Sequence, residues 1–337
     1  MGPVIGHEGV LRLLNRSLEM GRLAHSYLLV GPPHVGKMTV ALYLAQAVNC
    51  TGSPRPCQEC SQCVRVALGR HADVQVISLR EGESTRDISI DQVREVQRAA
   101  SLKPFEGSCR VFIVEGAERL SAAATNALLK TLEEPPPQVL LLLLATDEEA
   151  LLPTLRSRCQ RLELYSLGVQ EVAHALEERG VAPERARHLA LHSQGCPGIA
   201  LRSLEDPDWL EAREKEVQQV ADLLSTSIHQ RFALAAELAQ GFQANREDVQ
   251  ALLGLWLDWW RDLLLVKEGT TAYLVHPELR LTLEALAPEV DALAVARSLR
   301  LIQETLEVLD QNANARMALE HLLLGFPFLE RRAAAAT

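Results

Sequence analysis

Residues Gly31 to Lys37, with the sequence Gly-Pro-Pro-His-Val-Gly-Lys, constrain the fold of this chain more than any other segment. They follow directly on the apolar run Ser26–Val30 and precede a helical pattern at Met38–Val48. A glycine-rich loop in this setting turns backbone N–H groups toward an anion at the helix N-terminus, where the helix dipole favours negative charge. The segment therefore predicts an α/β domain built around a phosphate-binding P-loop.

The P-loop motif departs from its usual form at the last position. Met38 stands where a Ser or Thr hydroxyl would bind magnesium, and Thr39 comes one residue too late. A second departure follows the apolar run 111–114, which ends in Glu115-Gly116 instead of an Asp-Glu pair. Glu115 can still contact a metal ion, but Gly116 has no side chain to orient water. Taken alone, the run is an ordinary buried strand with a charged end.

Short apolar runs alternate with helical patterns in the first half of the chain, which is typical of a parallel sheet covered by helices. The predicted strands are Ser26–Val30, Asp73–Ser78, Arg110–Glu115, Val139–Ala145 and Gln160–Leu164. Helical spacing appears at Ile90–Ala100 and at Ala122–Glu134, where three prolines end the second helix. We expect this α/β domain to span residues 1–167.

Strand signals largely disappear beyond residue 167. A small helical domain is predicted over 168–206, and a Leu-, Ala- and Glu-rich region predicts an all-helical domain over 207–332. The last residues, 333–337, are expected to be frayed. The helical patterns in the small domain are Val169–Arg179, Pro183–His192 and Gly198–Ser203.

The formal net charge of −10 argues against a protein that holds nucleic acid over a broad face of its own, since phosphate contacts need clustered Lys and Arg. Trp256, Trp259 and Trp260 share one predicted helix. A helix-packing core is favoured over a base-stacking platform because no basic residues alternate with them. The longest apolar run, Val139–Ala145, is too short to span a bilayer, and the N-terminus has no signal-peptide pattern. We expect a cytoplasmic protein with no membrane partner.

Four of the seven cysteines fall within fourteen residues, namely Cys50, Cys57, Cys60 and Cys63. Four thiolates on a short loop suit a tetrahedral zinc ion, which stabilises a segment that has no core of its own. Because the chain supplies all four ligands, no position is left for water and the metal is expected to be structural. Free thiols or two disulfides are the alternative. A zinc-dependent nucleic-acid-binding module is a further one, supported only by Arg55 and Arg65.

Several segments resemble the bacterial clamp-loader family of AAA+ proteins, in the same order along nearly the whole chain. They are Gly21–Leu28, the four-cysteine insertion, Asn126–Pro136, Ala145-Thr146, Thr154–Cys159, Trp260–Leu264 and 312–316. The resemblance implies an AAA+ P-loop domain with a zinc module inserted at 50–63, a small helical lid and an all-α collar that mediates oligomerisation. It also implies that Thr146 occupies the sensor 1 position and that Ser157, Arg158 and Cys159 form an arginine-finger motif. Taken alone, Arg158 is an ordinary surface arginine.

Departures from the family pattern indicate a member that does not hydrolyse ATP. The family's gamma/tau motor has a Gly-Lys-Thr or Gly-Lys-Ser end, an Asp-Glu pair and a sensor 2 arginine, whereas this chain has Met38, Gly116 and Gly198 there. The resemblance then implies a stator of the DNA polymerase III clamp loader that completes a ring with gamma/tau and delta subunits. Such a stator places Arg158 against ATP on an adjacent gamma/tau subunit while the ring loads the sliding clamp on primed DNA.

An active gamma/tau-type ATPase is the alternative, and it requires Thr39 and Glu115 to replace the missing groups. The sequence leaves open whether ATP still binds without being hydrolysed. The degenerate nucleotide site consists of Gly31, Gly36, Lys37, Met38, Thr39, Glu115 and Thr146.

Overall fold

The computed structural model divides the chain into two compact units, Met1–Leu201 and Arg202–Thr337. The division of the chain into three domains stays a prediction, and the tail at 333–337 lies outside the described residues. Among the described residues, no helix is long and apolar enough to cross a bilayer. The structure describes residues 4–79, 87–271, 274–276, 279–311 and 313–329.

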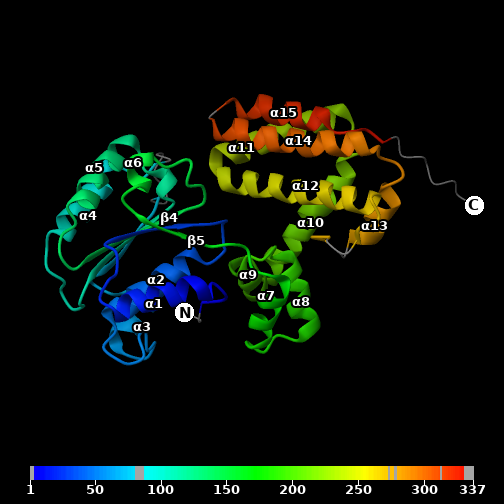
Figure 1. Ribbon diagram of the computed structural model, residues 1–337. Helices are drawn as coiled ribbons and strands as arrows, with labels where there is room; N and C mark the ends of the chain where they lie inside the picture. The colour runs from blue at the N-terminus through cyan, green and yellow to red at the C-terminus, as the bar shows by residue number, and fades with distance from the viewer. Residues whose placement is uncertain (1–3, 80–86, 272–273, 277–278, 312, 330–337) are drawn as a thin grey trace, which may run out of the picture. The chain divides into compact units, whose positions relative to one another are not determined.

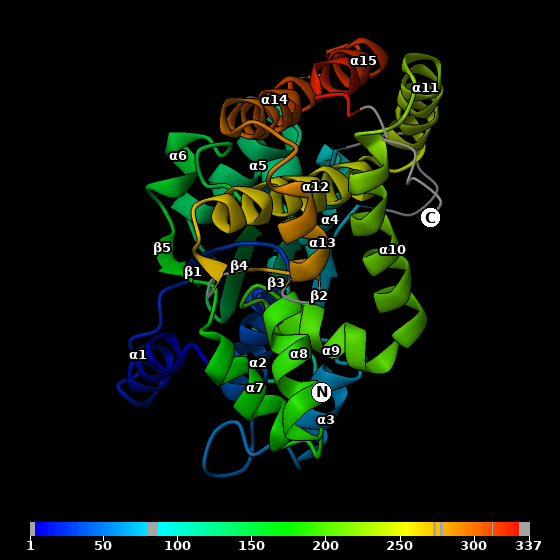
Figure 2. The same ribbon diagram turned by 90° about the vertical axis from the view of Figure 1, so that its right-hand side faces the viewer.

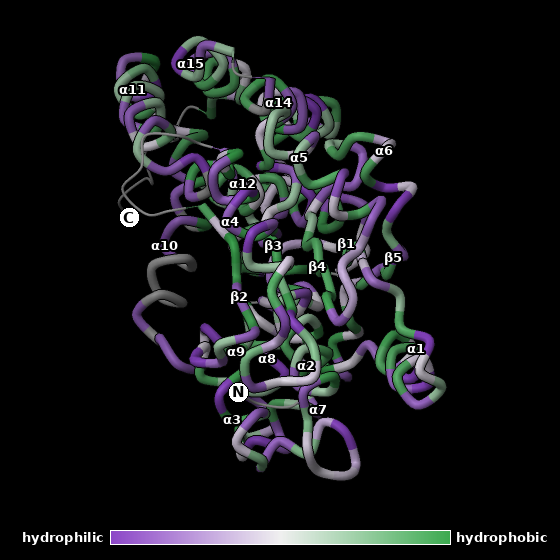
Figure 3. The backbone as a smooth tube through the Cα atoms, turned by 90° about the vertical axis from the view of Figure 1, so that its left-hand side faces the viewer, coloured by the Kyte–Doolittle hydropathy of each residue, from purple (hydrophilic) through white to green (hydrophobic). Residues whose placement is uncertain are grey.

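A five-stranded sheet forms the centre of the first unit, in the order β2-β3-β4-β1-β5 with every neighbouring pair parallel. The strands are β1 (Ser26–Val30), β2 (Val74–Ile77), β3 (Arg110–Glu115), β4 (Val139–Ala145) and β5 (Gln160–Glu163). Strands β1 and β4 are buried throughout, which explains why they are continuous apolar runs, and β4 is hydrophobic along its length (Figure 3). All five predicted strands are confirmed. Only the two edge strands, β2 and β5, are shorter than predicted, because each has a partner on one side alone.

Helices cover both faces of the sheet (Figure 1). Successive residues of a strand point to opposite faces, so Leu28 and Val30 of β1 pack in one core and Tyr27 and Leu29 in another. The first core is closed by α4 (Ile90–Ala100), α5 (Ala122–Glu133) and α6 (Pro153–Arg156). The second is closed by α1 (Glu8–Glu19), α2 (Lys37–Asn49) and α3 (Ser61–Ala67). The predicted α/β class is therefore confirmed.

Three helices follow the sheet, and they correspond to the three predicted helical patterns. They are α7 (Val169–Glu177), α8 (Pro183–His192) and α9 (Pro197–Glu205). Proline opens both α8 and α9, where its missing N–H costs nothing because the first N–H groups of a helix have no partner within it. The predicted turn at Gly195–Gly198 is therefore shorter than expected, since α9 begins at Pro197.

The second unit is helical, as predicted. Helix α12 (Arg246–Lys267) carries Trp256, Trp259 and Trp260, each at most 2% exposed. The ring centroids of Trp256 and Trp260 lie 6.1 and 5.3 Å from that of Phe326. The tryptophans are thus core residues, as expected. Helix α15 lies beside α11, and α14 lies along α12 (Figures 1 and 2). The helices are α10 (Pro207–Leu223), α11 (Ile228–Ala244), α12 (Arg246–Lys267), α13 (Arg280–Leu286), α14 (Ala292–Asp310) and α15 (Ala315–Gly325).

A buried arginine ties the end of this unit to its beginning. Arg231 of α11 is 4% exposed, and its guanidinium donates to five backbone carbonyl groups. Its acceptors come from the end of α10 and the turn after it and from the end of α15 and the segment that follows. These are Leu223, Thr226, Leu323, Phe326 and Pro327, at 2.7 to 3.2 Å. No sequence motif marks this residue.

We predict that Arg231→Met destabilises the second unit by about 3 kcal/mol, because methionine keeps the apolar stem but leaves buried carbonyl groups without donors. All four tryptophans of the chain lie in this unit, so urea unfolding followed by tryptophan fluorescence measures the loss. Arg280→Met is the matched control, because Arg280 is exposed and pairs only with Glu284 among the described residues. An equal loss of stability in both variants would contradict the assignment.

Candidate functional site

The carboxyl ends of β1, β3 and β4 meet at one edge of the sheet, because the three strands are parallel neighbours. Val30 pairs with Ala145, and Glu115 pairs with Leu144. The residues that follow these pairs, Gly31 and Thr146, therefore lie close to Glu115. The sequence prediction that these positions belong to one nucleotide site stays a prediction.

The predicted P-loop has a glycine at the N-cap of α2, and its lysine is directed toward the backbone of the loop. Gly36 has φ 113° at the N-cap of α2, a conformation that favours glycine. A side chain at Gly31 would lie 2.3 Å from the carbonyl oxygen of Leu164. Lys37 Nζ donates to the carbonyl oxygens of Gly31 and, at 2.8 Å, Pro32. Burial lowers the pKa of Lys37, although nearby carboxylates oppose the shift. The ammonium group is therefore bound to its own loop.

Two further segments pack on the same loop. The backbone N–H of Gly198 in α9 donates to the carbonyl oxygen of His34 at 2.9 Å, and a Cβ atom at Gly198 would lie 2.8 Å from that oxygen. From the other side, Nε2 of His7 lies 2.9 Å from the carbonyl oxygen of Val35. Position 198, at which the resemblance predicts the sensor 2 residue, thus has no room for a side chain in this arrangement. The loop therefore packs against α9 and against the N-cap residue of α1 as well as following the sheet.

The groups that would handle magnesium and water are incomplete. Met38 is half-buried and packs against the core, and Thr39 is half-buried in the first turn of α2. Glu115 is exposed at the end of β3, and Gly116, with φ 70°, begins the short 3-10 helix Ala117–Arg119.

Glu118 is an acidic residue of this edge that the sequence interpretation missed. Its Oε1 accepts a hydrogen bond of 3.2 Å from the backbone N–H of Thr146, and its Oε2 is buried with no hydrogen-bond partner among the described residues. Its charge also acts on Lys37 and opposes the lowering of the lysine pKa. A second acidic residue three positions after Glu115 is the signal that could have revealed it.

Arg158 lies at the amino ends of the strands, opposite the P-loop, in the segment between α6 and β5. Its Nη2 forms an ion pair of 2.7 Å with Glu133, and its Nη1 donates to the carbonyl oxygen of Thr154 at 2.8 Å. The carbonyl oxygen of Arg158 accepts from Ser26 Oγ at 2.8 Å, which fixes its backbone to β1. The side chain is 35% exposed, so the guanidinium remains accessible.

Neither of the two residues beside Arg158 carries a charge at neutral pH. Ser157 is exposed, and its hydroxyl donates to the carbonyl oxygen of Thr154 at 3.1 Å. Burial raises the pKa of Cys159 to about 11, so its thiol stays protonated and is a poor nucleophile at neutral pH. Of the three residues of the predicted motif, only Arg158 presents a cation.

The four clustered cysteines form a group of sulfur atoms. All four Sγ atoms lie within 4.8 Å of one another, whereas tetrahedral zinc with bonds of about 2.3 Å places its sulfur ligands about 3.8 Å apart. Cys50 follows α2, and Cys60 is the N-cap of α3. Cys63 lies within α3, so the prediction that one loop carries all four thiols is wrong for this residue. Cys63 lies in the first turn of α3, and its backbone N–H donates to the side chain of Cys60.

Backbone N–H groups surround these sulfur atoms. Gly52 and Cys57 each donate to Cys50 Sγ at 3.3 Å, and Cys60 donates to Cys57 Sγ at 3.3 Å. Such donors stabilise thiolates. Burial raises the pKa of Cys60, but hydrogen bonds from Cys63 and Thr51 outweigh burial and lower it to about 5. A Cβ atom at Gly52 would lie 2.8 Å from Cys57 Sγ. The donor set fits a soft divalent metal ion such as zinc.

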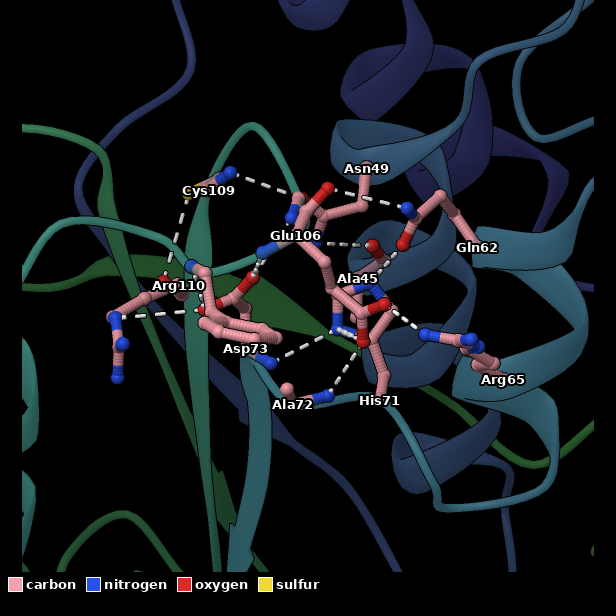
Figure 4. A network of polar contacts seen from close by, with 12 residues as sticks. Ala45, Asn49, Gln62, Arg65, His71, Ala72, Asp73, Glu106, Cys109 and Arg110 are labelled. Atoms are coloured by element: carbon pink, nitrogen blue, oxygen red, sulfur yellow. Dashed lines mark hydrogen bonds and ion pairs between the residues drawn. The ribbon is translucent and has the colours of Figure 1, made fainter.

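A buried carboxylate next to the cysteine module anchors the loop before β3 (Figure 4). Asp73, whose side chain is fully buried, accepts from the N–H groups of Phe105, Glu106 and Gly107 at 2.7 to 2.8 Å. Burial raises the pKa of Asp73, but these hydrogen bonds and the charge of Arg110 outweigh burial and lower it. The carboxylate therefore organises three successive backbone groups.

The same loop is bound to the cysteine module through Glu106 and Asn49 (Figure 4). Glu106 accepts from the backbone N–H of Ala72 at 3.0 Å and pairs with Arg65 of α3. Asn49, the last residue of α2, accepts from the N–H groups of residues 108 and 109 at 2.8 and 2.9 Å. His71 contacts Gln62 of α3 through its ring nitrogen. These contacts hold α3 against the sheet.

Subunits of bacterial DNA polymerase III are similar to this chain. A family model described as "DNA polymerase III, delta subunit" matches residues 6–168. Subunit delta' of Bacillus subtilis is 29% identical over 94% of this chain and 94% of its own length. Subunit tau of Escherichia coli is 32% identical over 74% of this chain, which spans only 39% of tau. A gamma subunit-related structure from Thermotoga maritima is 20% identical, with a TM-score of 0.42 over 93% of this chain and 97% of its own.

We predict that Asp73→Asn raises the exchange rates of the amide hydrogens of residues 105–107 about tenfold or more, because one amide oxygen replaces two carboxylate oxygens. Hydrogen exchange followed by mass spectrometry measures this effect. Asp91→Asn, at a side chain 79% exposed, is the matched control and should change nothing.

The effect of Asp73→Asn should depend on pH. A carboxyl group with a lowered pKa stabilises the fold above its unfolded pKa of about 3.9, and this stabilisation is lost as the pH falls through the folded pKa. The difference in thermal stability between wild type and variant is therefore present at pH 7 and shrinks below about pH 4. A difference that grows on acidification would contradict the role of the carboxylate.

Proposed function

The chain belongs to the bacterial clamp-loader family of DNA polymerase III subunits, and we propose from that premise that it is a ring subunit of the delta' type. In this role it does not hydrolyse ATP but lends Arg158 to a neighbouring gamma/tau subunit. Its partners are gamma/tau and delta subunits, the sliding clamp and, within the complex, primed DNA. Similarity alone does not choose this role, because tau-type subunits also match the chain. The choice depends on the nucleotide site at the carboxyl ends of the strands and on Arg158 at their amino ends.

The state of the nucleotide site argues against intrinsic hydrolysis. Gly116 supplies no group to orient a water molecule, and Met38 supplies no hydroxyl for magnesium. Lys37, which would neutralise phosphate charge, donates to carbonyl groups of its own loop. The contact between Gly198 and His34 leaves no room for an arginine at position 198. Four independent features therefore favour an inactive site over a motor, although the glycine-rich backbone that binds phosphate is retained.

The observation that carries the proposal is the separation of Arg158 from the P-loop of its own chain. Gln160 pairs with Tyr27, and Gly31 follows Tyr27 by four residues, so about 13 Å of parallel strand divides the two edges. Arg158 lies still further from the loop, before Gln160. An accessible arginine at this edge can stabilise phosphate charge only in another molecule. This geometry supports a finger that acts in trans.

The cysteine module completes the proposal as a structural zinc site. Cys50, Cys57, Cys60 and Cys63 supply four thiolates, so the ion has no open position for water or substrate. When bound, zinc joins the end of α2 to the start of α3 and stabilises the segment between them. The alternative of a nucleic-acid-binding module gains no support from the contacts of Arg65, because its guanidinium pairs with Glu106.

We predict that Arg158→Ala removes about one ATP per complex from the rapid phase of phosphate release when the assembled loader meets clamp and primed DNA. An arginine finger contributes about 10³-fold or more to hydrolysis, so the one site that depends on this chain becomes silent in that phase. Rapid-mixing measurements of phosphate release on the reconstituted complex test this expectation.

Arg156→Ala is the matched control for Arg158→Ala. Arg156 lies two residues away, carries the same charge and pairs with Glu149 at 2.7 Å. The control complex should keep the full rapid phase. Equal phosphate release from wild type and Arg158→Ala would remove the finger assignment, and motor-like hydrolysis by the purified chain alone would favour the active ATPase.

Zinc content provides a separate prediction. The purified chain should contain about one zinc ion per molecule by elemental mass spectrometry, and Cys57→Ser should lose most of it together with several degrees of thermal stability. Cys109→Ser, outside the cluster, should retain both. Metal-free chain that kept its stability but lost DNA binding would support the nucleic-acid-binding module instead.

A further inference from the structure

The guanidinium of Arg158 is bound within its own chain by an anion. Its Nη2 lies 2.7 Å from Glu133 Oε1, and its Nη1 donates to Thr154 and, at 3.4 Å, to Ser157 Oγ. Glu133 is the last residue of α5, and its side chain is 50% exposed. The group proposed to act on a neighbour's phosphate is thus already paired with a carboxylate.

Glu133 lies at the end of α5, where the helix dipole is negative. The last carbonyl groups of a helix carry the negative end of its dipole, so a glutamate at the end of α5 is unfavourable unless a cation lies beside it. Arg158 is that cation. His25 Nε2 lies 3.1 Å from the carbonyl oxygen of Leu132, and Ser26 holds the backbone of Arg158. His25 thus holds the backbone just before Glu133, and Ser26 holds the backbone of Arg158.

The carboxylate of Glu133 would repel an incoming phosphate. A nucleotide triphosphate brings several negative charges, and the carboxylate of Glu133 is a like charge within hydrogen-bond distance of the guanidinium. Arg158 has one positive charge to share between the two anions. Contact with phosphate is therefore an exchange in which the guanidinium leaves the carboxylate.

Resting on the proposed function, we propose that Glu133 is a positioning residue that holds the finger in a resting place until a neighbour's nucleotide replaces it. Because both side chains of the pair are partly exposed, the pair is weak enough to exchange readily. Glu133 thereby lowers the fraction of time that Arg158 contacts the neighbour's phosphate. The device requires only these two residues and no movement of the sheet.

The test is Glu133→Gln in the reconstituted complex, which keeps the size of the side chain and removes its charge. The rate of ATP hydrolysis stimulated by clamp and DNA should rise two- to fivefold, the range expected for loss of one exposed ion pair. The gain should shrink as salt is added, because salt already screens the pair in the wild type. A purely structural role would not depend on salt in this way.

Glu134→Gln is the matched control, since Glu134 is the next residue, is exposed and carries the same charge. It should leave the rate unchanged. Combining Glu133→Gln with Arg158→Ala should abolish the gain, because the carboxylate acts through the arginine. An unchanged or lower rate for Glu133→Gln, with Arg158→Ala still impaired, would overturn this inference alone. A normal rate for Arg158→Ala would overturn the proposed function as well.

Discussion

The parallel direction of all five strands is the constraint on which the rest of the first unit depends. It collects Gly31, Glu115 and Thr146 at the carboxyl edge and leaves Arg158 at the amino edge. One chain therefore presents a phosphate-type loop on one side and a cation on the other. The proposed function uses this separation, because a ring of such subunits would bring the cation of one member to the loop of the next. Under the proposed function, a subunit can therefore contribute its arginine whether or not its own nucleotide site is intact.

The glycine-rich loop Gly31–Lys37 has a packing role in addition to the nucleotide role predicted for it. Gly31 allows contact with the carbonyl oxygen of Leu164, and the contact of Gly198 with His34 joins α9 to the loop. These contacts require small residues whatever the ligand. A magnesium ligand at position 38 or a water-orienting carboxylate at 116 serves only the nucleotide. The packing described above does not need these two groups, whereas a larger residue at Gly31 or Gly198 would clash with a backbone carbonyl oxygen.

Much of the fold and of the site could be predicted from local patterns in the sequence. The residues whose roles depend on long-range contacts became visible only in the structure. Buried parallel strands are continuous apolar runs, so all five were predicted to within a residue at each end. The cysteine cluster was equally visible because its members are close in sequence. Asp73 was missed because its acceptor role depends on N–H groups 32 to 34 residues later. Arg231 was missed for the same reason, since three of its five acceptors lie 92 to 96 residues away.

The position of the cysteine module limits what it can do. Helix α2 begins at the carboxyl edge, and its 13 residues, about 20 Å long, carry Cys50 toward the amino edge, away from the P-loop. There the module is anchored beside β2 through Asp73 and Glu106, whereas Arg158 precedes β5 at the other side of the sheet. Four strand spacings of about 4.8 Å separate β2 from β5, or about 19 Å. A metal ion bound in the module would lie far from both the P-loop and Arg158. It could influence either of them only through the fold, as a structural metal ion does.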